Sequence, residues 1–243
     1  MSGPAGRVVV VTGAAGLAGR VTTRALRDTG ATVVAVGSSA GRLAELAQDL
    51  PGISTEVTDL RDGPAVNELA ARIRANHSAV DGLVHLVGGY RGGAGFTSNT
   101  DDDWRFLSAA LVDTLRHVTV AFHDDLVRSS GGRAVIVSAT AAAAPTAGAA
   151  NYAAAKAATE AWMLAMADSL RRSQSGRAGH PVPQTSAATI LVIKALVDDR
   201  MRAEHPQRRF PGYTHVDELA ARIVGLWSME AAECNGARLL LGD

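Results

Sequence analysis

The sequence predicts an α/β fold in which a doubly wound, mostly parallel sheet of seven strands carries helices on both faces. Two observations predict it. Strand-like and helix-like segments alternate along the whole chain, and a glycine-rich turn joins the first strand to the first helix. With 243 residues, 47% of them hydrophobic, the chain suits one domain that spans residues 1–243 and buries a large core.

The expected strands are short runs rich in valine, isoleucine, leucine and alanine, which is typical of parallel strands buried on both faces. They lie at residues 8–11, 32–36, 53–57, 83–87, 134–138, 188–193 and 237–241. The first expected helix begins after Gly19. The other expected helices span residues 42–50, 63–75, 103–127, 152–172 and 216–229. The stretch at 173–185 should be a surface loop. The stretch at 88–103 should cross the carboxyl edge of the sheet, where ligands bind.

Charge and composition exclude several classes of partner. Equal numbers of basic and acidic residues, 24 of each, give zero net charge, so no basic surface indicates nucleic acid or an anionic membrane. The single cysteine, Cys234, rules out an intramolecular disulfide, and the seven histidines show no metal-ligand spacing. No apolar signal core begins the chain, and no long apolar span follows. We therefore expect a cytoplasmic protein without a metal site.

The glycine-rich turn is the first candidate binding site. Four valines at 8–11 lead into Gly13, Gly16 and Gly19, and a helical pattern follows. Glycines allow a tight bend and a close approach of the backbone to a phosphate, while the helix N-terminus offers unpaired N–H groups and a partial positive charge. We expect a dinucleotide pyrophosphate to bind here; the alternative is an ordinary β–α turn. The expected contacts are Gly13, Ala15, Gly16, Leu17 and Gly19.

Tyr152 and Lys156 are the candidate catalytic pair. They stand four residues apart in an alanine-rich run without glycine or proline, which favours a helix with both side chains on one face. Because a neighbouring ammonium favours the phenolate, we expect Lys156 to lower the pKa of Tyr152. A phenol that titrates closer to neutrality can donate or accept a proton in catalysis. The alternative is a chance pair on the surface.

The residues after the second strand bear on cofactor choice. Sites that prefer NAD place an acid at the end of this strand for the ribose 2′-hydroxyl, but here the position is Gly37. Ser38, Ser39 and Arg42 follow, and two hydroxyls and a guanidinium could bind a 2′-phosphate. We therefore expect NADP(H) in preference to NAD(H), unless Arg42 points to solvent.

The order of these motifs resembles that of the short-chain dehydrogenase/reductases, and the resemblance covers essentially the whole chain. Two further landmarks agree. Asp59 and Leu60 follow the third strand, where the family has the acid that contacts the adenine ring. Val87, Gly88 and Gly89 stand where the family has Asn-Ala-Gly after the fourth strand. The resemblance implies a single Rossmann-fold domain with these residues in the cofactor site.

The resemblance also assigns catalytic roles. Tyr152 matches the catalytic acid or base, and Lys156 matches the residue that lowers its pKa and holds the nicotinamide ribose. The family's usual serine, thirteen residues before the tyrosine, is replaced by Ala139, with Ser138 and Thr140 on either side. We expect the hydroxyl of Ser138 to polarise the substrate, with Thr140 as the alternative.

Other positions narrow the resemblance. The family's helix asparagine falls at Leu111, so its proton relay should be absent or rebuilt, and Ile193-Lys194-Ala195 replaces a Pro-Gly. Dihydropteridine-reductase-like members are most similar, because they share the Gly-Gly-aromatic-x-Gly-Gly loop (here 88–93) and the Leu-x-Asp ending (here 196–198). They also have a Tyr–Lys pair without the usual serine, which implies that its loss does not abolish hydride transfer.

We therefore predict an oxidoreductase that passes a hydride between a nicotinamide and a small carbonyl, alcohol or imine substrate. The alternatives are a non-redox cyclase or isomerase on the same fold and a cofactor-binding protein without turnover. The resemblance implies a homodimer or homotetramer assembled through the helices at 103–127 and 151–172. Tyr90 and Arg91, in the loop at 88–103, are candidates for the substrate pocket.

Overall fold

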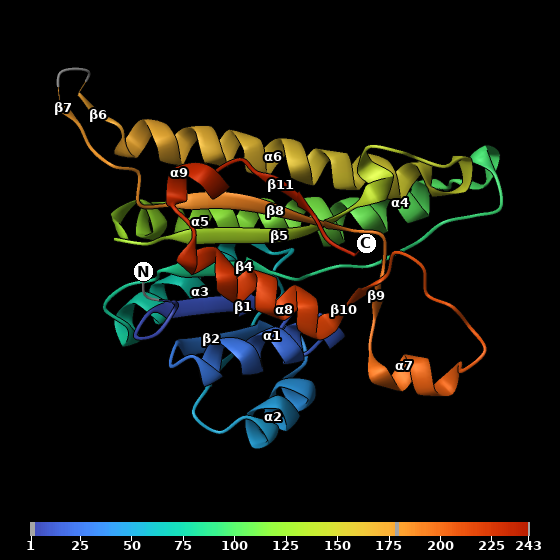
Figure 1. Cartoon of the computed structure of the whole chain (residues 1–243), viewed down its shortest axis with the longest axis horizontal. Helices are drawn as coiled ribbons and strands as arrows, with labels where there is room; N and C mark the ends of the chain where they lie inside the picture. Colours follow the sequence, from blue (N-terminus) through green and yellow to red (C-terminus); the bar gives the residue numbers. More distant parts are fainter. Residues whose placement is uncertain (1–2, 178–179, 243) are drawn as a thin grey trace.

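Seven parallel strands form the central sheet of the computed structural model, which describes residues 3–177 and 180–242 (Figure 1). The strand order is β11-β8-β5-β4-β1-β2-β3, and every neighbouring pair is parallel. The bounds are β1 Val8–Thr12, β2 Thr32–Gly37, β3 Ser54–Val57, β4 Gly82–His85, β5 Arg133–Ala139, β8 Ala187–Ile193 and β11 Arg238–Leu240. The order reverses between β1 and β4, which opens a crevice for ligands at the carboxyl ends of the strands. The predicted α/β fold is confirmed.

Helices cover both faces because alternate strand residues point to opposite sides of the sheet. Val10 of β1, for example, packs on one face and Val9 on the other. The first face is covered by α3 (Gly63–Asn76), α5 (Thr114–Arg128) and α6 (Ala150–Gln174). The second face is covered by α1 (Leu17–Asp28), α2 (Ala40–Asp49) and α8 (Val216–Gly225). Figure 1 shows these two layers on opposite sides of the strands.

The long helix expected at 103–127 contains an unexpected change of period. α4 (Asp101–Leu107) passes into a π-helical segment, Ser108–Asp113, and then into α5. π-helical turns are rare and are frequent at functional sites. The apolar pattern predicts a helix here but carries no signal for this turn.

The other boundaries agree with the sequence to within a few residues. The first helix begins at Leu17, before Gly19, and β4 ends at His85, two residues earlier than expected. α8 ends at Gly225 and a 3-10 turn, Leu226–Ser228, follows it. The loop expected at 173–185 contains a short antiparallel pair, β6 (Gly176–Arg177) and β7 (His180–Pro181), and its residues 178 and 179 lie outside the described part.

One segment leaves the sheet between β8 and α8. Its two ends, β9 (Leu196–Val197) and β10 (Thr214–His215), pair in parallel. Between them lies α7 (Asp199–Glu204), which projects from the body of the protein in Figure 1. A short helix, α9 (Ala231–Cys234), precedes β11.

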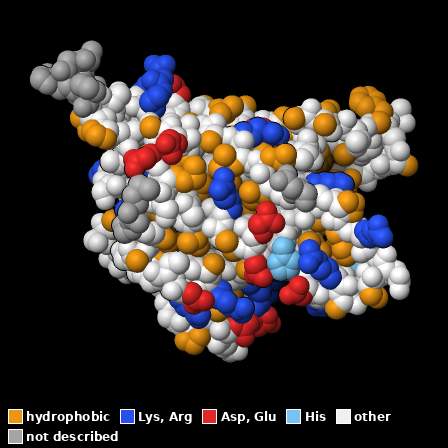
Figure 2. Space-filling model, viewed as in Figure 1, with side chains coloured by type: hydrophobic (Ala, Val, Ile, Leu, Met, Phe, Trp, Pro, Cys, Tyr) orange, Lys and Arg blue, Asp and Glu red, His pale blue; other side chains and the backbone are white. Residues whose placement is uncertain are grey.

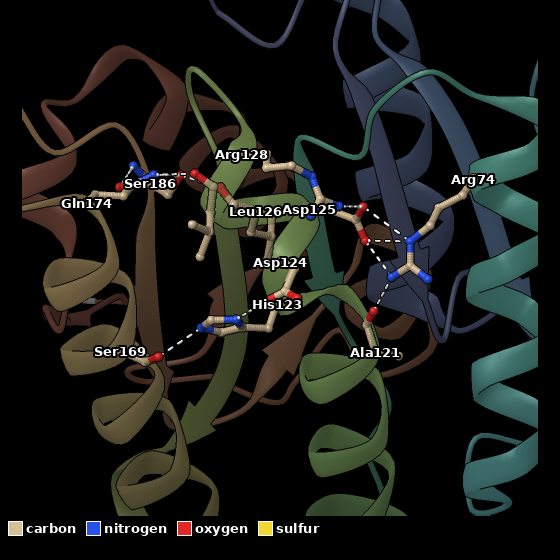
Figure 3. Close-up of polar contacts among 11 residues, drawn as sticks. Arg74, Ala121, His123, Asp124, Asp125, Leu126, Arg128, Ser169, Gln174 and Ser186 are labelled. Carbon is tan, nitrogen blue, oxygen red and sulfur yellow. Dashed lines mark hydrogen bonds and ion pairs between the residues drawn. The ribbon is translucent and has the colours of Figure 1, made fainter.

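Polar contacts fix the helices on the first face (Figure 3). The carboxylate of Asp125 on α5, only 7% exposed, accepts hydrogen bonds from Arg74 of α3 and from Arg128, each at 2.7 Å. The Nε2 of His123 on α5 lies 2.9 Å from the hydroxyl oxygen of Ser169 on α6. Because the side chains of Arg74 and Arg128 are 42% and 64% exposed, solvent screens both ion pairs and they contribute less than a buried pair would. The contact with Arg74 joins α5 to α3, and the contact with Ser169 joins α5 to α6, the helix that carries the candidate catalytic pair.

Among the described residues, no helix is long and apolar enough to cross a membrane. In the same part of the chain, no group of three or more His, Cys, Asp or Glu side chains is placed to hold a metal ion. Positive and negative side chains are interspersed on the face shown in Figure 2.

Candidate active site

The glycine-rich turn folds as predicted, with one difference. Gly13 has a φ of +72°, and a Cβ there would lie 2.8 Å from the backbone of Leu86, so only glycine fits. Gly16 precedes α1, whose first turn has no side-chain cap and no acidic residue, which leaves its N–H groups available to an anion. Gly19 lies in the first turn of α1 rather than in the loop. A Cβ on Gly19 would lie 2.2 Å from the carbonyl oxygen of Gly13, so this glycine allows the helix to pack against the turn.

A cavity of about 410 Å³ lies at the carboxyl ends of β1, β2 and β4. It brings together ten of the residues predicted to bind the cofactor: Gly13, Ala15, Gly16, Ser38, Ser39, Arg42, Asp59, Leu60, Val87 and Gly88. Five other predicted residues do not line it: Leu17, Gly19, Gly89, Tyr152 and Lys156. The predicted residues that line the cavity come from four separate parts of the sequence and meet at the point where the strand order reverses.

One wall of the cavity was missed by sequence reasoning. Phe106 of α4, Ala110 of the π-helix and Thr114 of α5 line it. They stand four residues apart, and the wider π-helical turn keeps that spacing close to one side of the helix. The apolar pattern marks only the side of a helix that faces the core, so it could not show which other side meets a ligand.

Arg42 is exposed, but its guanidinium contacts the glycine-rich turn. Its guanidinium donates to the carbonyl of Ala15 at 2.7 Å, and its backbone N–H donates to Ser39, which caps α2. A second guanidinium in the cavity, that of Arg61, was missed by sequence reasoning. It donates to the carboxylate of Asp59 at 2.7 Å and holds the pKa of that carboxyl below its usual range. Its position two residues after Asp59, at the same sheet edge, was the available signal.

The candidate catalytic pair lies on one face of α6, as predicted. Lys156 is only 8% exposed; its ammonium donates to the carbonyl of Val137 at 2.8 Å and lies 5.9 Å from the ring centre of Tyr152. Burial lowers the pKa of Lys156 to about 8, against the opposing charge of Glu160. Burial raises the pKa of Tyr152, and the nearby Tyr90 adds a smaller effect in the same direction. The direction is the opposite of the one expected from the sequence, because burial desolvates the phenol and disfavours the phenolate.

Ser138 does not join this pair. Its hydroxyl, 1% exposed, donates to Glu160 at 2.5 Å, and the other oxygen of Glu160 accepts from Arg238 at 2.9 Å. Glu160 stands eight residues after Tyr152 on α6, which is about 12 Å along the helix. Thr140, on the other side of Ala139, begins a 3-10 turn at the end of β5. The hydroxyl of Ser138, which the sequence predicts to polarise the substrate, is therefore occupied by a hydrogen bond to Glu160.

His85, at the end of β4, is a buried polar residue that sequence reasoning did not single out. Its Nδ1 lies 2.7 Å from the hydroxyl of Thr12, and its Nε2 lies 3.2 Å from that of Thr114. Burial lowers the pKa of His85 to about 3, and the nearby charge of Lys156 acts in the same direction. The imidazole is therefore neutral and links β1, β4 and α5 beside the cavity. With Leu111 and Lys156 it also lines a cavity of about 10 Å³, room for roughly one water.

The loop after β4 reaches the candidate pair. The ring of Tyr90 meets that of Tyr152 edge to face, with 5.1 Å between centroids. Arg91 places its guanidinium 3.9 Å from the ring centre of Phe106 and forms an ion pair with Asp103. Of the two residues considered for the substrate pocket, Tyr90 thus lies against the candidate catalytic phenol.

The parallel sheet, the open helix N-terminus and the cavity together define a dinucleotide-binding α/β protein. The chain belongs to the short chain dehydrogenase family, a family of oxidoreductases, whose model matches residues 7–174. The narrower resemblance to dihydropteridine-reductase-like members stays a prediction.

Three relatives show the extent of the similarity. The 3-oxoacyl-(acyl-carrier-protein) reductase FabG of Vibrio harveyi is 27% identical over 240 residues, 96% of this chain and 95% of the relative. A short chain dehydrogenase of Shigella flexneri, solved with NADP, has a TM-score of 0.83 at 20% identity over 98% of both chains. A short chain oxidoreductase of Pseudomonas aeruginosa, described as containing an atypical catalytic center, has a TM-score of 0.81 at 20% identity, covering 97% of this chain and 95% of that one. The two structures share the fold.

Proposed function

We propose that the protein is an NADP(H)-dependent oxidoreductase that acts on a small carbonyl, alcohol or imine substrate. The observation that carries this proposal is the cavity of about 410 Å³, which joins the glycine-rich turn, the residues after β2 and β3, and Val87–Gly88. When bound, the nicotinamide supplies or accepts the hydride. Membership of an oxidoreductase family argues against the non-redox and the catalytically silent alternatives.

The lining of the cavity fits a dinucleotide. The first N–H groups of α1, without a side-chain cap, suit the pyrophosphate, and Gly13 has no room for a side chain that would hold it off. Asp59 and Leu60 would hold the adenine, as the family resemblance implies. Tyr152 and Lys156, on the neighbouring helix, would face the nicotinamide ribose.

The residues after β2 favour NADP(H) over NAD(H). Gly37 offers no carboxylate to repel a 2′-phosphate, and Ser38, Ser39 and Arg42 line the same cavity. Arg61 adds a second guanidinium that sequence reasoning had not included. Two guanidiniums and two hydroxyls are the groups that bind phosphate oxygens best.

The raised pKa of Tyr152 keeps its phenol protonated at neutral pH, so we propose that it acts as the acid of a reduction. The phenol would give its proton to the oxygen or nitrogen of the substrate while the neighbouring carbon receives the hydride. Lys156, mostly protonated at neutral pH, would stabilise the phenolate that forms. Thr140, rather than Ser138, would polarise the substrate, because Ser138 is bound to Glu160.

Titration of the purified protein with NADPH and with NADH, followed by nicotinamide fluorescence, tests the cofactor assignment. We expect NADPH to bind more tightly than NADH. Arg42→Ala should lower the affinity for NADPH by at least tenfold and leave the affinity for NADH unchanged. Equal binding of both cofactors would remove the 2′-phosphate assignment. Binding of neither would remove the proposed function. Turnover that survives Tyr152→Phe would remove the assignment of the acid.

We also propose that the protein is a homodimer or homotetramer assembled through α5 and α6. Their outer faces border a groove of about 450 Å³, lined among others by Val120, Trp162 and Met166, and Val120 is exposed. Static light scattering on a sizing column should give twice or four times the mass of one chain. Val120→Asp should shift the mass toward one chain. A single-chain mass for the unmodified protein would contradict the proposal.

A further inference from the structure

We propose that Tyr90 is a specificity-determining residue, which covers Tyr152 and makes the site favour flat, conjugated carbonyl or imine substrates over aliphatic ones. This inference rests on the proposed function and names its substrate class. Its basis is the contact between the two tyrosine rings, the way the loop at 88–100 is held, and a third aromatic ring, that of Phe106, at the cofactor cavity.

The two rings form one aromatic surface. Their centroids are 5.1 Å apart and their planes meet at 72°, which is the edge-to-face geometry that aromatic pairs prefer. Tyr152 also packs against a buried cluster of Leu107, Leu111 and Ala155. Tyr90 itself is 66% exposed. A substrate that approaches the phenol of Tyr152 from solvent therefore meets the ring of Tyr90.

The loop that carries Tyr90 is held in place by the turn before α6. The N–H of Gly93 donates to the carbonyl of Gly148 at 2.7 Å. The amide of Asn99 donates to the carbonyl of Ala147 at 2.8 Å, and the amide of Asn151 donates to that of Thr100 at 2.9 Å. Because Asn151 is the neighbour of Tyr152, the same bonds fix both tyrosines relative to each other.

The glycine two residues after Tyr90 determines where its ring lies. A Cβ on Gly92 would be 2.4 Å from the hydroxyl oxygen of Tyr90 and 3.0 Å from the carbonyl oxygen of Gly148. The Tyr90 side chain therefore folds back over a position where only glycine leaves room for it. This explains the spacing of the aromatic residue and the glycines in the loop, and it offers a way to displace Tyr90 without removing it.

A third aromatic ring lies in the wall of the cofactor cavity. Phe106 lines that cavity, and its ring carries the guanidinium of Arg91 at 3.9 Å. Arg91 is held in turn by Asp103 at 3.3 Å. A planar substrate between the cavity and Tyr152 can stack on these groups, whereas an aliphatic substrate gains only the burial of apolar surface. Stacking on one ring favours a flat ligand by roughly two- to tenfold.

The test compares two diketones that differ in shape, flat 9,10-phenanthrenequinone and aliphatic 2,3-butanedione, each reduced with NADPH. We expect Tyr90→Ala to lower the ratio of their kcat/KM values by two- to tenfold and Tyr90→Phe to preserve it. Gly92→Ala, which pushes the ring aside, should act like Tyr90→Ala. Phe96→Ala removes another exposed ring from the same loop and should leave the ratio unchanged. An unchanged ratio in Tyr90→Ala would overturn the proposal while leaving the proposed function standing.

A second readout does not depend on turnover. The chain has only three tyrosines, so absorbance at 295 nm follows Tyr90, Tyr152 and Tyr213, and Tyr152→Phe identifies the ionisation of Tyr152. Because burial raises the pKa of Tyr152 and Tyr90 adds to the effect, Tyr90→Ala should move this ionisation to lower pH. No movement would show that Tyr90 does not cover the phenol and would overturn the inference. If the unmodified protein binds neither cofactor, the proposed function fails first, and the substrate class fails with it.

Discussion

Ser138 donates its hydroxyl hydrogen to Glu160 across 2.5 Å, in a buried contact that joins β5 to α6. Glu160 also accepts from Arg238 of β11, so one carboxylate connects two strands of the sheet with the helix that carries Tyr152 and Lys156. The hydroxyl that the sequence placed in catalysis is thus part of the packing between sheet and helix.

Ser138→Ala should therefore affect folding more than catalysis. A hydrogen bond to a charged group contributes about 1.5–3 kcal/mol, so we expect the free energy of unfolding in urea to fall by about that amount. We expect kcat to change by less than about threefold, because the variant leaves Tyr152 in place. Thr140→Val is the matched variant, and it should lower kcat by at least about tenfold. A large loss of kcat in Ser138→Ala, at unchanged stability, would return this serine to the catalytic group.

The buried ammonium of Lys156 should make stability depend on pH. Its pKa is about 8 in the folded chain and 10.5 ordinarily, so between these values the folded chain binds fewer protons than the unfolded one. Stability should rise with pH across that window, on the order of 3 kcal/mol. Lys156→Met should abolish this rise in the free energy of unfolding, measured in urea from pH 7.5 to 10.5. Lys194→Met, which replaces the only other lysine, should keep it; loss of the rise in both variants would contradict this account.

His85 should make the protein sensitive to acid. Its pKa is about 3 in the folded chain and 6.5 ordinarily, so the unfolded chain binds more protons between these values and stability is lost as the pH falls through them. The loss should be on the order of 5 kcal/mol over the full window. His85→Gln, which keeps a polar side chain without titration, should flatten the dependence of unfolding on pH between 6.5 and 4. His205→Gln, at an exposed histidine, should retain the slope of the unmodified protein.

Gly37→Asp should change the cofactor preference. A Cβ at this position would lie 3.6 Å from the side chain of Leu43, an ordinary contact, so the residue fits. The carboxylate should repel a 2′-phosphate and accept a hydrogen bond from a 2′-hydroxyl. We expect NADPH affinity to fall by at least about tenfold and NADH affinity to rise, measured by nicotinamide fluorescence. Gly37→Asn, without the charge, should lower NADPH affinity less; equal effects of the two variants would indicate a steric cause.

Local patterns predicted most of the fold. Four valines before Gly13, and the alanine-rich run around Tyr152, identify their elements because strand burial and helix propensity act over a few residues. The residues predicted to bind a cofactor could be grouped from the sequence because the carboxyl ends of parallel strands meet at one edge. Ten of them line one cavity in the structure.

What the sequence could not supply depends on contacts between distant residues. The pKa of Tyr152 depends on how completely α4 and the loop at 88–100 cover it, and spacing along one helix carries no such information. Ser138 was misplaced because strand residues alternate between faces, and a shift of one residue exchanges the catalytic edge for the interior. His85 and Arg61 carry no motif and gain their importance only from neighbours brought by other strands.

The π-helical segment Ser108–Asp113 lies between α4 and α5, so its length sets how the two helices are rotated relative to each other. Phe106 before this segment and Ala110 within it meet the cofactor cavity, whereas Leu115 and Val118 after it fill the core. Removing one residue from this segment would turn the two halves of the helix by about 100° relative to each other. Either the cavity wall or the core would then face the wrong way. We therefore expect related sequences to carry substitutions in this stretch but no gap of one residue.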